Sequence, residues 1–304
     1  MSFKKNRFYR TFLGKINQRF PVLIAKMRYR YIFGKSLNLK NPQNLNEKIQ
    51  WLSLFSDTTE WTRLADKYAV RGFVEERGLK KILNELYGKW DRVEDIDWDE
   101  LPSSFVLKSN NGSGFYKIVK DKKSLPHPET EEMLQKWLNS SCDTTTTEFH
   151  YTRIKSCIIA EKILENTADD KIYSSSIVDY KMWCINGKVK YIWTVSNRRP
   201  GAFDGTLFDT KWNVIEDAVV KNPHVHKPTK MLPKPENLDE MLSVAGTLSK
   251  GFPVVRVDLY NIGGKITFGE MTFTTHGGNI DYLKPELLLE MGNEIDLSKV
   301  KKVR

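Results

Sequence analysis

The stretch "FPVVRVDLYNIGGKITFGEMTF", residues 252–273, carries Arg256, Asp258 and Glu270 among apolar residues on either side of a glycine turn. This pattern predicts a hairpin of two strands. Because side chains alternate between the faces of a strand, Arg256 and Asp258 share one face, as do Glu270 and Thr272. The pattern is otherwise typical of a buried hairpin, so an arginine and two carboxylates within it indicate a functional role for these charged side chains.

The register of this hairpin decides which charged side chains meet. If Asn261 pairs with Lys265 around a three-residue turn, Arg256 lies opposite Glu270 and Asp258 lies diagonally beside it. Two neighbouring carboxylates repel each other unless a cation joins them, and Mg²⁺ commonly links one or two carboxylates to phosphate groups. The alternative is a structural ion pair of Arg256 with either carboxylate on an exposed face.

A second motif, "FVLKSNNGSGF" (105–115), predicts a strand that carries Lys108, followed by a glycine-rich loop and another strand. The backbone N–H groups of a loop such as Asn111, Gly112, Ser113 and Gly114 can close over phosphates. The motif is neither a Walker A sequence nor a dinucleotide-binding fingerprint. A plain Asn-Gly hairpin turn without a ligand is the alternative.

A third motif, "IIAEKIL" (158–164), interrupts a run typical of a buried strand with Glu161 and Lys162. A buried acid needs a partner. The exocyclic amine of adenine would supply one, and the backbone of residues 162–164 would pair with the ring nitrogens. Alternatively, Glu161 faces water from an edge strand.

Positive charge is concentrated at the start of the chain. The net charge is +10, and residues 1–50 hold 12 Lys and Arg side chains against the single acid Glu47. Residues 4–35 mix these basic residues with aromatic ones at loosely helical spacing, which is typical of helices that bind anionic membranes, acidic polymers or partners. Helices packed on the body with solvated basic faces are an equal alternative. No nucleic-acid-binding signature accompanies the charge.

Several classes of protein are excluded by composition. The three cysteines, Cys142, Cys157 and Cys184, have no spacing typical of a zinc site or a disulfide framework. The apolar stretch 20–27 is too short to cross a bilayer and lacks a cleavage site, so we expect a cytoplasmic protein.

The rest of the chain predicts a mixture of helices and strands. Helices are expected over 44–79, capped by Asn46, over 127–141 and over 235–251. Residues 176–197 predict two strands around the turn Asn186-Gly187.

Taken in order, the motifs resemble an ATP-grasp enzyme. The TupA-like branch, named after the teichuronopeptide-biosynthesis protein, is the most similar, through "NLNEKIQWL", "DKYAVR", "FVLKSNNGSG", "DYKMWCINGK" and "FPVVRVDLY". The resemblance covers roughly residues 36–297. It implies an α+β ATP-grasp fold, with two α+β subdomains clasping ATP and a helical basic N-terminal segment. The implied segments are a basic N-terminus (1–45), a helical region (46–100), a small subdomain (101–160) and a C-terminal subdomain (161–304).

The resemblance also implies ATP and Mg²⁺ as cofactors and assigns residues to them. The residues implied for the ATP phosphates are Lys108, Lys67, Lys181 and the loop 111–114. Those implied for adenine are Glu161 and the backbone of Lys162, Ile163 and Leu164, with Asp169 or Asp170 for the ribose. Asp258 and Glu270 would bind Mg²⁺ with Thr272, which stands where the family usually has asparagine. Arg256 would meet the transferred phosphoryl group, and Lys181 is the second candidate catalytic residue.

The implied reaction is the phosphorylation of a carboxylate by ATP to an acyl phosphate, followed by attack of an amine to form an amide. We expect the carboxylate to belong to a uronic acid of a surface polysaccharide such as a capsule, or of its lipid-linked precursor, and the amine to be an amino acid or a relative. The basic segment 4–35 would favour this acidic saccharide or the inner membrane face, and no nucleic-acid partner is expected.

Candidate substrate contacts follow from two further loops. Arg198 and Arg199 could clamp a carboxylate, or could simply be solvated, and His276 follows the hairpin as a further candidate. One alternative function is a glycosyltransferase that uses the "DWD" sequence at 97–99. Another is an ATP-binding scaffold without turnover, which the Thr272 departure would explain.

Overall fold

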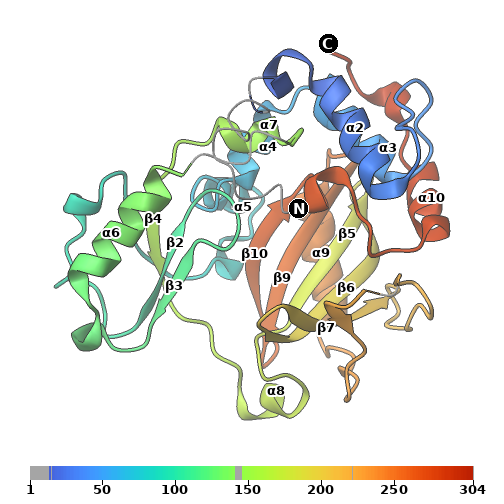
Figure 1. Ribbon diagram of the computed structural model, residues 1–304. Coiled ribbons are helices and arrows are strands. Elements are labelled where there is room, and N and C mark those ends of the chain that lie inside the picture. Colours follow the sequence, from blue (N-terminus) through green and yellow to red (C-terminus); the bar gives the residue numbers. More distant parts are fainter. Residues whose placement is uncertain (1–13, 15, 141–145, 221, 304) are drawn as a thin grey trace. The chain divides into compact units, whose positions relative to one another are not determined.

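The computed structural model describes residues 14, 16–140, 146–220 and 222–303, and the chain forms two compact units. The large unit contains residues 1–58, 143–149 and 166–304, and the small unit contains residues 59–142 and 150–165. Each unit has its own β-sheet (Figure 1). The division into four consecutive segments stays a prediction, whereas these two units are interleaved along the chain.

The small unit is built on an antiparallel sheet of strand order β1-β4-β2-β3. Its strands are β1 (Leu86–Trp90), β2 (Phe105–Ser109), β3 (Tyr116–Val119) and β4 (Ile158–Glu161). Its helices are α4 (Thr59–Ala65), α5 (Val70–Glu76) and α6 (His127–Leu138), with 3-10 turns at Lys80–Ile82, Val93–Asp95 and Lys122–Ser124. The short helix α7 (Phe149–Thr152) begins at the boundary between the units.

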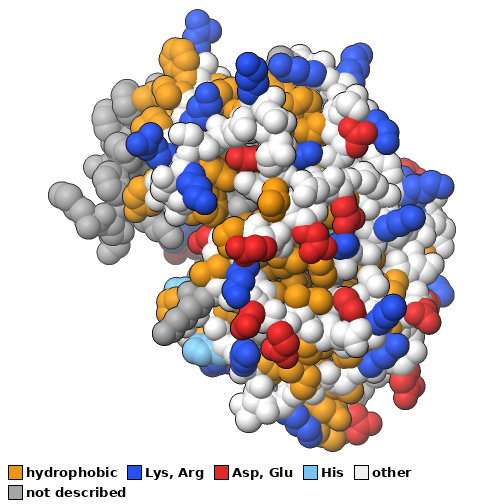
Figure 2. Space-filling model, turned by 90° about the vertical axis from the view of Figure 1, so that its right-hand side faces the viewer, with side chains coloured by type: hydrophobic (Ala, Val, Ile, Leu, Met, Phe, Trp, Pro, Cys, Tyr) orange, Lys and Arg blue, Asp and Glu red, His pale blue; other side chains and the backbone are white. Residues whose placement is uncertain are grey.

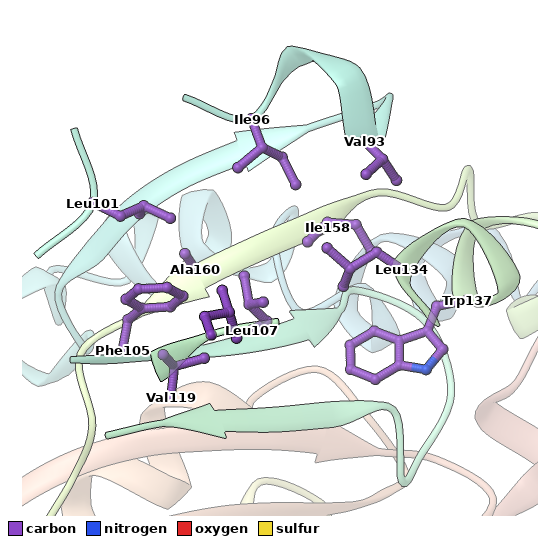
Figure 3. Close-up of a cluster of buried hydrophobic side chains, with 11 residues drawn as sticks. Val93, Ile96, Leu101, Phe105, Leu107, Val119, Leu134, Trp137, Ile158 and Ala160 are labelled. Atoms are coloured by element: carbon purple, nitrogen blue, oxygen red, sulfur yellow. The ribbon is translucent and has the colours of Figure 1, made fainter. Parts of the chain in front are cut away.

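One face of this sheet packs on α6 and forms the core of the small unit (Figure 3). Leu134 and Trp137 of α6 pack with side chains that the strands direct to this face: Phe105, Leu107, Val119, Ile158 and Ala160. Because side chains alternate along a strand, the intervening residues Lys108 and Glu161 lie on the opposite face. The core therefore fixes the strands that present these two charged groups.

The large unit is built on a six-stranded sheet of order β10-β9-β5-β6-β7-β8, in which β7 and β8 are parallel and the other pairs antiparallel. Its strands are β5 (Asp179–Ile185), β6 (Lys188–Arg199), β7 (Ala202–Phe208), β8 (Val225–His226), β9 (Val254–Ile262) and β10 (Lys265–Thr272). Helix α9 (Leu238–Ser249) packs on β5, β6 and β9 (Figure 1). Asn186 and Gly187 form the turn between β5 and β6 with φ of 50° and 77°, as predicted.

The hairpin β9–β10 forms as predicted, but its predicted register is wrong. Gly263 and Gly264, with φ of 53° and 79°, make a two-residue turn, because successive glycines accept the positive φ that such a turn requires. A bulge at Gly269 then shifts the pairing, so that Glu270 lies opposite Asp258 and Thr272 lies opposite Arg256. A Cβ atom on Gly269 would lie 2.9 Å from the carbonyl oxygen of Asp258.

The expected long helix over 44–79 is interrupted. It consists of α3 (Leu45–Phe55), α4 and α5. Asn44, not Asn46, caps α3, because its side chain accepts the N–H of Glu47 while the Glu47 carboxylate accepts the N–H of Asn44. Asn46 is buried within the helix and bonds both backbone groups of Ile280.

The remaining helices belong to the large unit. They are α2 (Pro21–Phe33), α8 (Ala168–Tyr173), α10 (Pro285–Asn293) and 3-10 turns at Thr275–Gly278 and Leu297–Lys299. Helix α3 packs on both α2 and α10. Among the helices in the described ranges, none has both the length and the apolar character needed to cross a bilayer.

Candidate functional site

Charged side chains of alternating sign follow one another across four neighbouring strands of the large sheet. Lys181 of β5 lies directly opposite Asp258 of β9, and its ammonium group contacts Oδ2 of that carboxylate. Lys181 also lies 3.3 Å from Asp179, which in turn pairs with Arg198 of β6. We call this set the charge network: Arg198, Asp179, Lys181, Asp258, Arg256 and Glu270.

Arg256 and Asp258 form the most buried pair of the charge network, with 8% and 1% of their surfaces exposed. Arg256 donates from Nε to Oδ1 at 2.7 Å and from Nη2 to Oδ2 at 2.8 Å, which is the parallel geometry that a guanidinium favours. Burial opposes ionisation of Asp258, but the charges of Arg256 and Lys181 outweigh it and lower the pKa of this carboxyl to about 2. Asp258 is therefore ionised at neutral pH.

The same guanidinium group reaches the neighbouring strand. Its Nη2 lies 3.2 Å from Oε1 of Glu270 and 3.1 Å from the hydroxyl of Thr272, and Nη1 donates to Thr275 at 3.0 Å. Thr272 donates to Oε1 of Glu270 at 3.1 Å. Arg256 thus joins the two carboxylates that the corrected register places opposite each other.

Oxygen ligands of the kind that magnesium takes lie on this face, and both oxygens of Asp258 are bonded to Arg256 and Lys181. Asp258 and Glu270 are directly opposite in the ladder, and carboxylate and hydroxyl oxygens are the hard ligands that Mg²⁺ takes. The side chain of Glu270 is 42% exposed, so its second oxygen can be reached from solvent. Within the described residues, no cluster of three or more His, Cys, Asp and Glu side chains is arranged to hold a metal ion. A cation here would therefore need oxygens from a ligand such as phosphate in addition to the two carboxylates.

The face of the small sheet opposite α6 carries a second group of charges. Glu161 is 7% exposed and accepts from Lys108 at 2.7 Å and from Arg71 at 3.3 Å. Because β4 lies between β1 and β2, Glu161 is not on an edge strand facing water. The buried acid thus has two cationic partners inside the small unit.

Lys67 anchors the glycine-rich loop. The Lys67 ammonium donates to the carbonyl oxygen of Gly112 at 2.5 Å, and its backbone N–H donates to Asn110. Gly112 and Gly114 have φ of 73° and 83°, which favour glycine. Asn111 is buried, whereas Ser113 and Gly114 are exposed, so the tip of the loop is open to a ligand.

The segment after β4 offers fewer backbone hydrogen-bonding groups for adenine than predicted. The N–H of Lys162 donates to Glu85 and its carbonyl oxygen accepts from Asn84, so Ile163 and Leu164 remain as the residues to pair with an adenine ring. Asp169 and Asp170, the two candidates for binding the ribose, differ in how their side chains are bonded.

Asp170 closes a capping box at the start of α8 with Thr167, which uses one of its carboxylate oxygens. Asp169 is exposed in the first turn of the same helix. The geometry therefore favours Asp169 as the candidate ribose ligand.

Both candidate substrate arginines are already paired within the large unit. Arg198 contacts Asp179, and Arg199 donates to Asp204 at 2.9 Å. Both arginine side chains remain largely exposed, at 48% and 44%, and Arg198 belongs to the charge network. Their role as a clamp for a substrate carboxylate stays a prediction.

The loop that carries His276 is held by α3. Gln50 donates to the carbonyl oxygens of Gly277 and Gly278 at 2.9 and 3.2 Å. His276 has φ of 52°, lies 3.3 Å from Asp281 and packs edge-on against Tyr282. The imidazole is half-exposed and remains available to a ligand.

Two of these charged residues, Asp179 and Arg71, were not predicted, although their spacing from Lys181 and Lys67 could have indicated them. Asp179 lies two residues before Lys181 on β5, so the period of a strand directs both to one face. Arg71 follows Lys67 by four residues, a spacing that places both on one side of a helical turn.

The sequence of this chain matches the model of the TupA-like ATP-grasp family over residues 47–296. The chain belongs to this family. The predicted ATP-grasp fold is thereby confirmed. No protein with a curated functional description matches the sequence significantly.

Solved structures with a similar fold include two kinds of ligase. The L-amino acid ligase from Bacillus licheniformis is 15% identical, with 93% of this chain and 62% of that chain covered and a TM-score of 0.49. The D-alanine–D-alanine ligase from Bacillus anthracis is 18% identical, with coverages of 80% and 71% and a TM-score of 0.46. A second structure of that enzyme, complexed with ATP, has 15% identity, coverages of 78% and 64% and a TM-score of 0.41. The TupA-like chain thus spans 64% of the length of this last structure.

Proposed function

We propose that this TupA-like ATP-grasp protein is an ATP-dependent ligase that joins a carboxylate to an amine through an acyl phosphate. The observation that carries the proposal is the buried Arg256 that binds Asp258 and reaches Glu270 on the same sheet face. Family membership supports the use of ATP. Because the reaction consumes ATP, we place it in the cytoplasm.

The charge network suits phosphoryl transfer, in which the protein positions the phosphate and neutralises the charge that spreads over its oxygens. Asp258 and Glu270 would hold Mg²⁺, which when bound neutralises negative charge on the phosphates. Arg256 would bind oxygens of the transferred group, and Lys181, fixed between two aspartates, would hold a neighbouring phosphate oxygen. In the small unit, Lys108, Lys67 and the loop 111–114 would bind the remaining phosphates, and Glu161 would meet adenine.

Neither chemical step of the proposed reaction requires a nucleophile from the protein. A carboxylate oxygen attacks the γ-phosphorus and ADP leaves. The amine nitrogen then attacks the acyl carbon, phosphate leaves and the amine loses a proton. The protein's task is to bind, orient and exclude water, which requires no Ser-His-Asp or Cys-His set.

The proposed carboxylate substrate is a uronic acid of a surface polysaccharide or its lipid-linked precursor, and the proposed amine is an amino acid or a relative. This choice is supported by the resemblance to polysaccharide-biosynthesis proteins and by the basic N-terminal segment. His276 and the region of Arg198 and Arg199 are the proposed contacts to the acceptor.

The glycosyltransferase alternative is disfavoured by the geometry of the "DWD" sequence. Asp97 accepts the backbone N–H groups of Asp99 and Glu100 at 3.0 and 3.3 Å, so its side chain closes a local turn. A carboxylate used in this way is a poor candidate for holding a metal-bound sugar nucleotide.

The test is product analysis with ATP, Mg²⁺, oligouronates and a panel of amino acids. We expect ADP release only when both substrates are present, and a product whose mass equals glycan plus amine minus water. ATP binding that persists in Glu270→Gln while turnover stops would exclude the scaffold alternative. Binding of a UDP-sugar without ATP affinity would contradict the proposal.

A further inference from the structure

Helix α2 exposes a continuous apolar stripe. Phe20, which precedes the helix, and Leu23, Met27 and Tyr31 have 55%, 51%, 59% and 87% of their surfaces exposed. Their spacing of three and four residues places them on one side of the helix. We call these four residues the α2 stripe. Large apolar side chains gathered on one exposed helix face commonly mark an interaction site.

The opposite side of the helix anchors it to the large unit. Ala25 and Tyr29 are 3% and 5% exposed and pack with Leu37 and Leu54. The hydroxyl of Tyr29 also accepts from Asn44 at 3.2 Å, next to the cap of α3. Because this inner face is packed, the α2 stripe is held outward and does not belong to the core.

Basic residues form a row directly beside the stripe. At 100° per residue, Lys26 and Arg30 fall together on the helix flank next to Leu23 and Met27, and both are exposed. Arg19, which precedes the helix, is exposed as well. No Asp or Glu occurs before Glu47 in the sequence. Hydrophobic and Lys or Arg side chains also lie side by side at the top of the surface in Figure 2.

We propose that α2 is a membrane-docking helix that lies in the interface of a bilayer containing anionic phospholipids. The row of Lys and Arg would bind the headgroups, while the α2 stripe enters the boundary of the acyl chains. A soluble acidic polysaccharide would be attracted by the same charges, but it offers no apolar phase for Leu23 and Met27. The apolar and basic rows together therefore favour a lipid surface. This inference does not depend on the proposed ligase activity.

The experiment is co-sedimentation of the full chain with vesicles. We expect binding to mixed phosphatidylglycerol–phosphatidylcholine vesicles, weaker binding to pure phosphatidylcholine, and loss of binding at high salt. The double variant Leu23→Ser/Met27→Ser should lower the partition coefficient by about tenfold or more. Lys26→Glu/Arg30→Glu should lower it by a similar factor on anionic vesicles.

The matched control is Ile172→Ser in α8, which removes an apolar side chain of similar exposure, 54%, from another helix of the large unit. It should leave vesicle binding unchanged. Thermal unfolding of each variant separates loss of binding from loss of fold, and Tyr31→Ser, at the most exposed position, provides a mild second variant.

Two results would overturn the proposal. One is the absence of binding to anionic vesicles. The other is charge-dependent binding that Leu23→Ser/Met27→Ser leaves intact and that a soluble polyuronate abolishes, since this would identify a polyanion site. Neither result would bear on the ligase assay, which uses soluble substrates.

Discussion

Lys181 lies directly opposite Asp258 in the β5–β9 ladder, and its ammonium group contacts a carboxylate that also accepts two hydrogen bonds from Arg256. One buried anion is thus shared by two cations. The Asp258 carboxylate raises the pKa of the Arg256 guanidinium in a place where burial alone would lower it.

Removing the shared anion should be costly. We expect Asp258→Asn to lower the free energy of unfolding by about 3 to 5 kcal/mol, because it removes the carboxylate that the buried Arg256 and the partly buried Lys181 share. Urea unfolding measures this effect, and ligase activity should also fall below detection. Asp204→Asn is the matched control, since Asp204 is similarly buried but pairs with Arg199 outside the charge network. Equal destabilisation by both changes would contradict this account.

The shape of the Arg256 guanidinium should matter as much as its charge. Arg256→Lys keeps the positive charge but cannot bind Asp258 through two parallel bonds while reaching Glu270 and Thr272. We expect kcat to fall by about 100-fold or more, with a smaller change in the KM for ATP. The comparison is Arg92→Lys, because Arg92 pairs with Glu94 at the exposed surface of the small unit. A drop confined to KM would instead assign Arg256 to ground-state binding.

In the small unit, Glu161 should contribute to nucleotide affinity. Glu161→Gln removes the charge that holds Lys108 and Arg71, so we expect ATP binding to weaken by about tenfold and stability to fall by about 1 to 3 kcal/mol. Isothermal titration calorimetry with ATP and Mg²⁺ tests the affinity. Glu85→Gln is the control, because Glu85 pairs with Lys162 at the surface. Unchanged affinity in Glu161→Gln would remove Glu161 from the nucleotide site.

Glycine positions provide a test of the hairpin register. At Gly269 a methyl group would meet the carbonyl oxygen of Asp258 at 2.9 Å, so Gly269→Ala should destabilise the protein by about 1 to 3 kcal/mol and lower activity. Gly72, in α5, has no neighbouring atom within 4 Å of the added methyl and has ordinary helical φ, so Gly72→Ala should stabilise by up to about 1 kcal/mol. Thermal unfolding of the two variants should move in opposite directions.

Local sequence patterns indicate the family and the chemistry of single residues, but not how strands pair. The order of the motifs was sufficient to predict the ATP-grasp fold, and the identities of Arg256, Asp258 and Glu270 indicated charge chemistry in the hairpin. The register could not be predicted, because it depends on a two-residue turn and on a bulge at Gly269 that packs against Asp258.

Ion pairs between residues far apart in the sequence could not be predicted either. Glu161 pairs with Arg71, which lies 90 residues earlier, and nothing in the local pattern joins them. Asp179 pairs with Arg198, a candidate substrate contact, which lies 19 residues away. The Arg198–Asp179 contact depends on which strands are neighbours in the sheet, and the Glu161–Arg71 contact joins a strand to helix α5. Spacing along one strand determines only the face of the sheet.

The last prediction concerns the buried thiols. Burial raises the pKa of both Cys157 and Cys184 from about 9 to about 12, because the thiolate is poorly solvated there. A raised pKa means that the charged thiolate is disfavoured, so at pH 8 only about one thiol in 10,000 would be ionised.

Cys142 lies outside the described residues, and Cys142→Ser removes it from the measurement. We expect native Cys142→Ser to be inert toward a thiol-reactive disulfide at pH 8 and to release two equivalents after unfolding in urea. Rapid reaction of the native variant would show that one of the two thiols is reached by solvent.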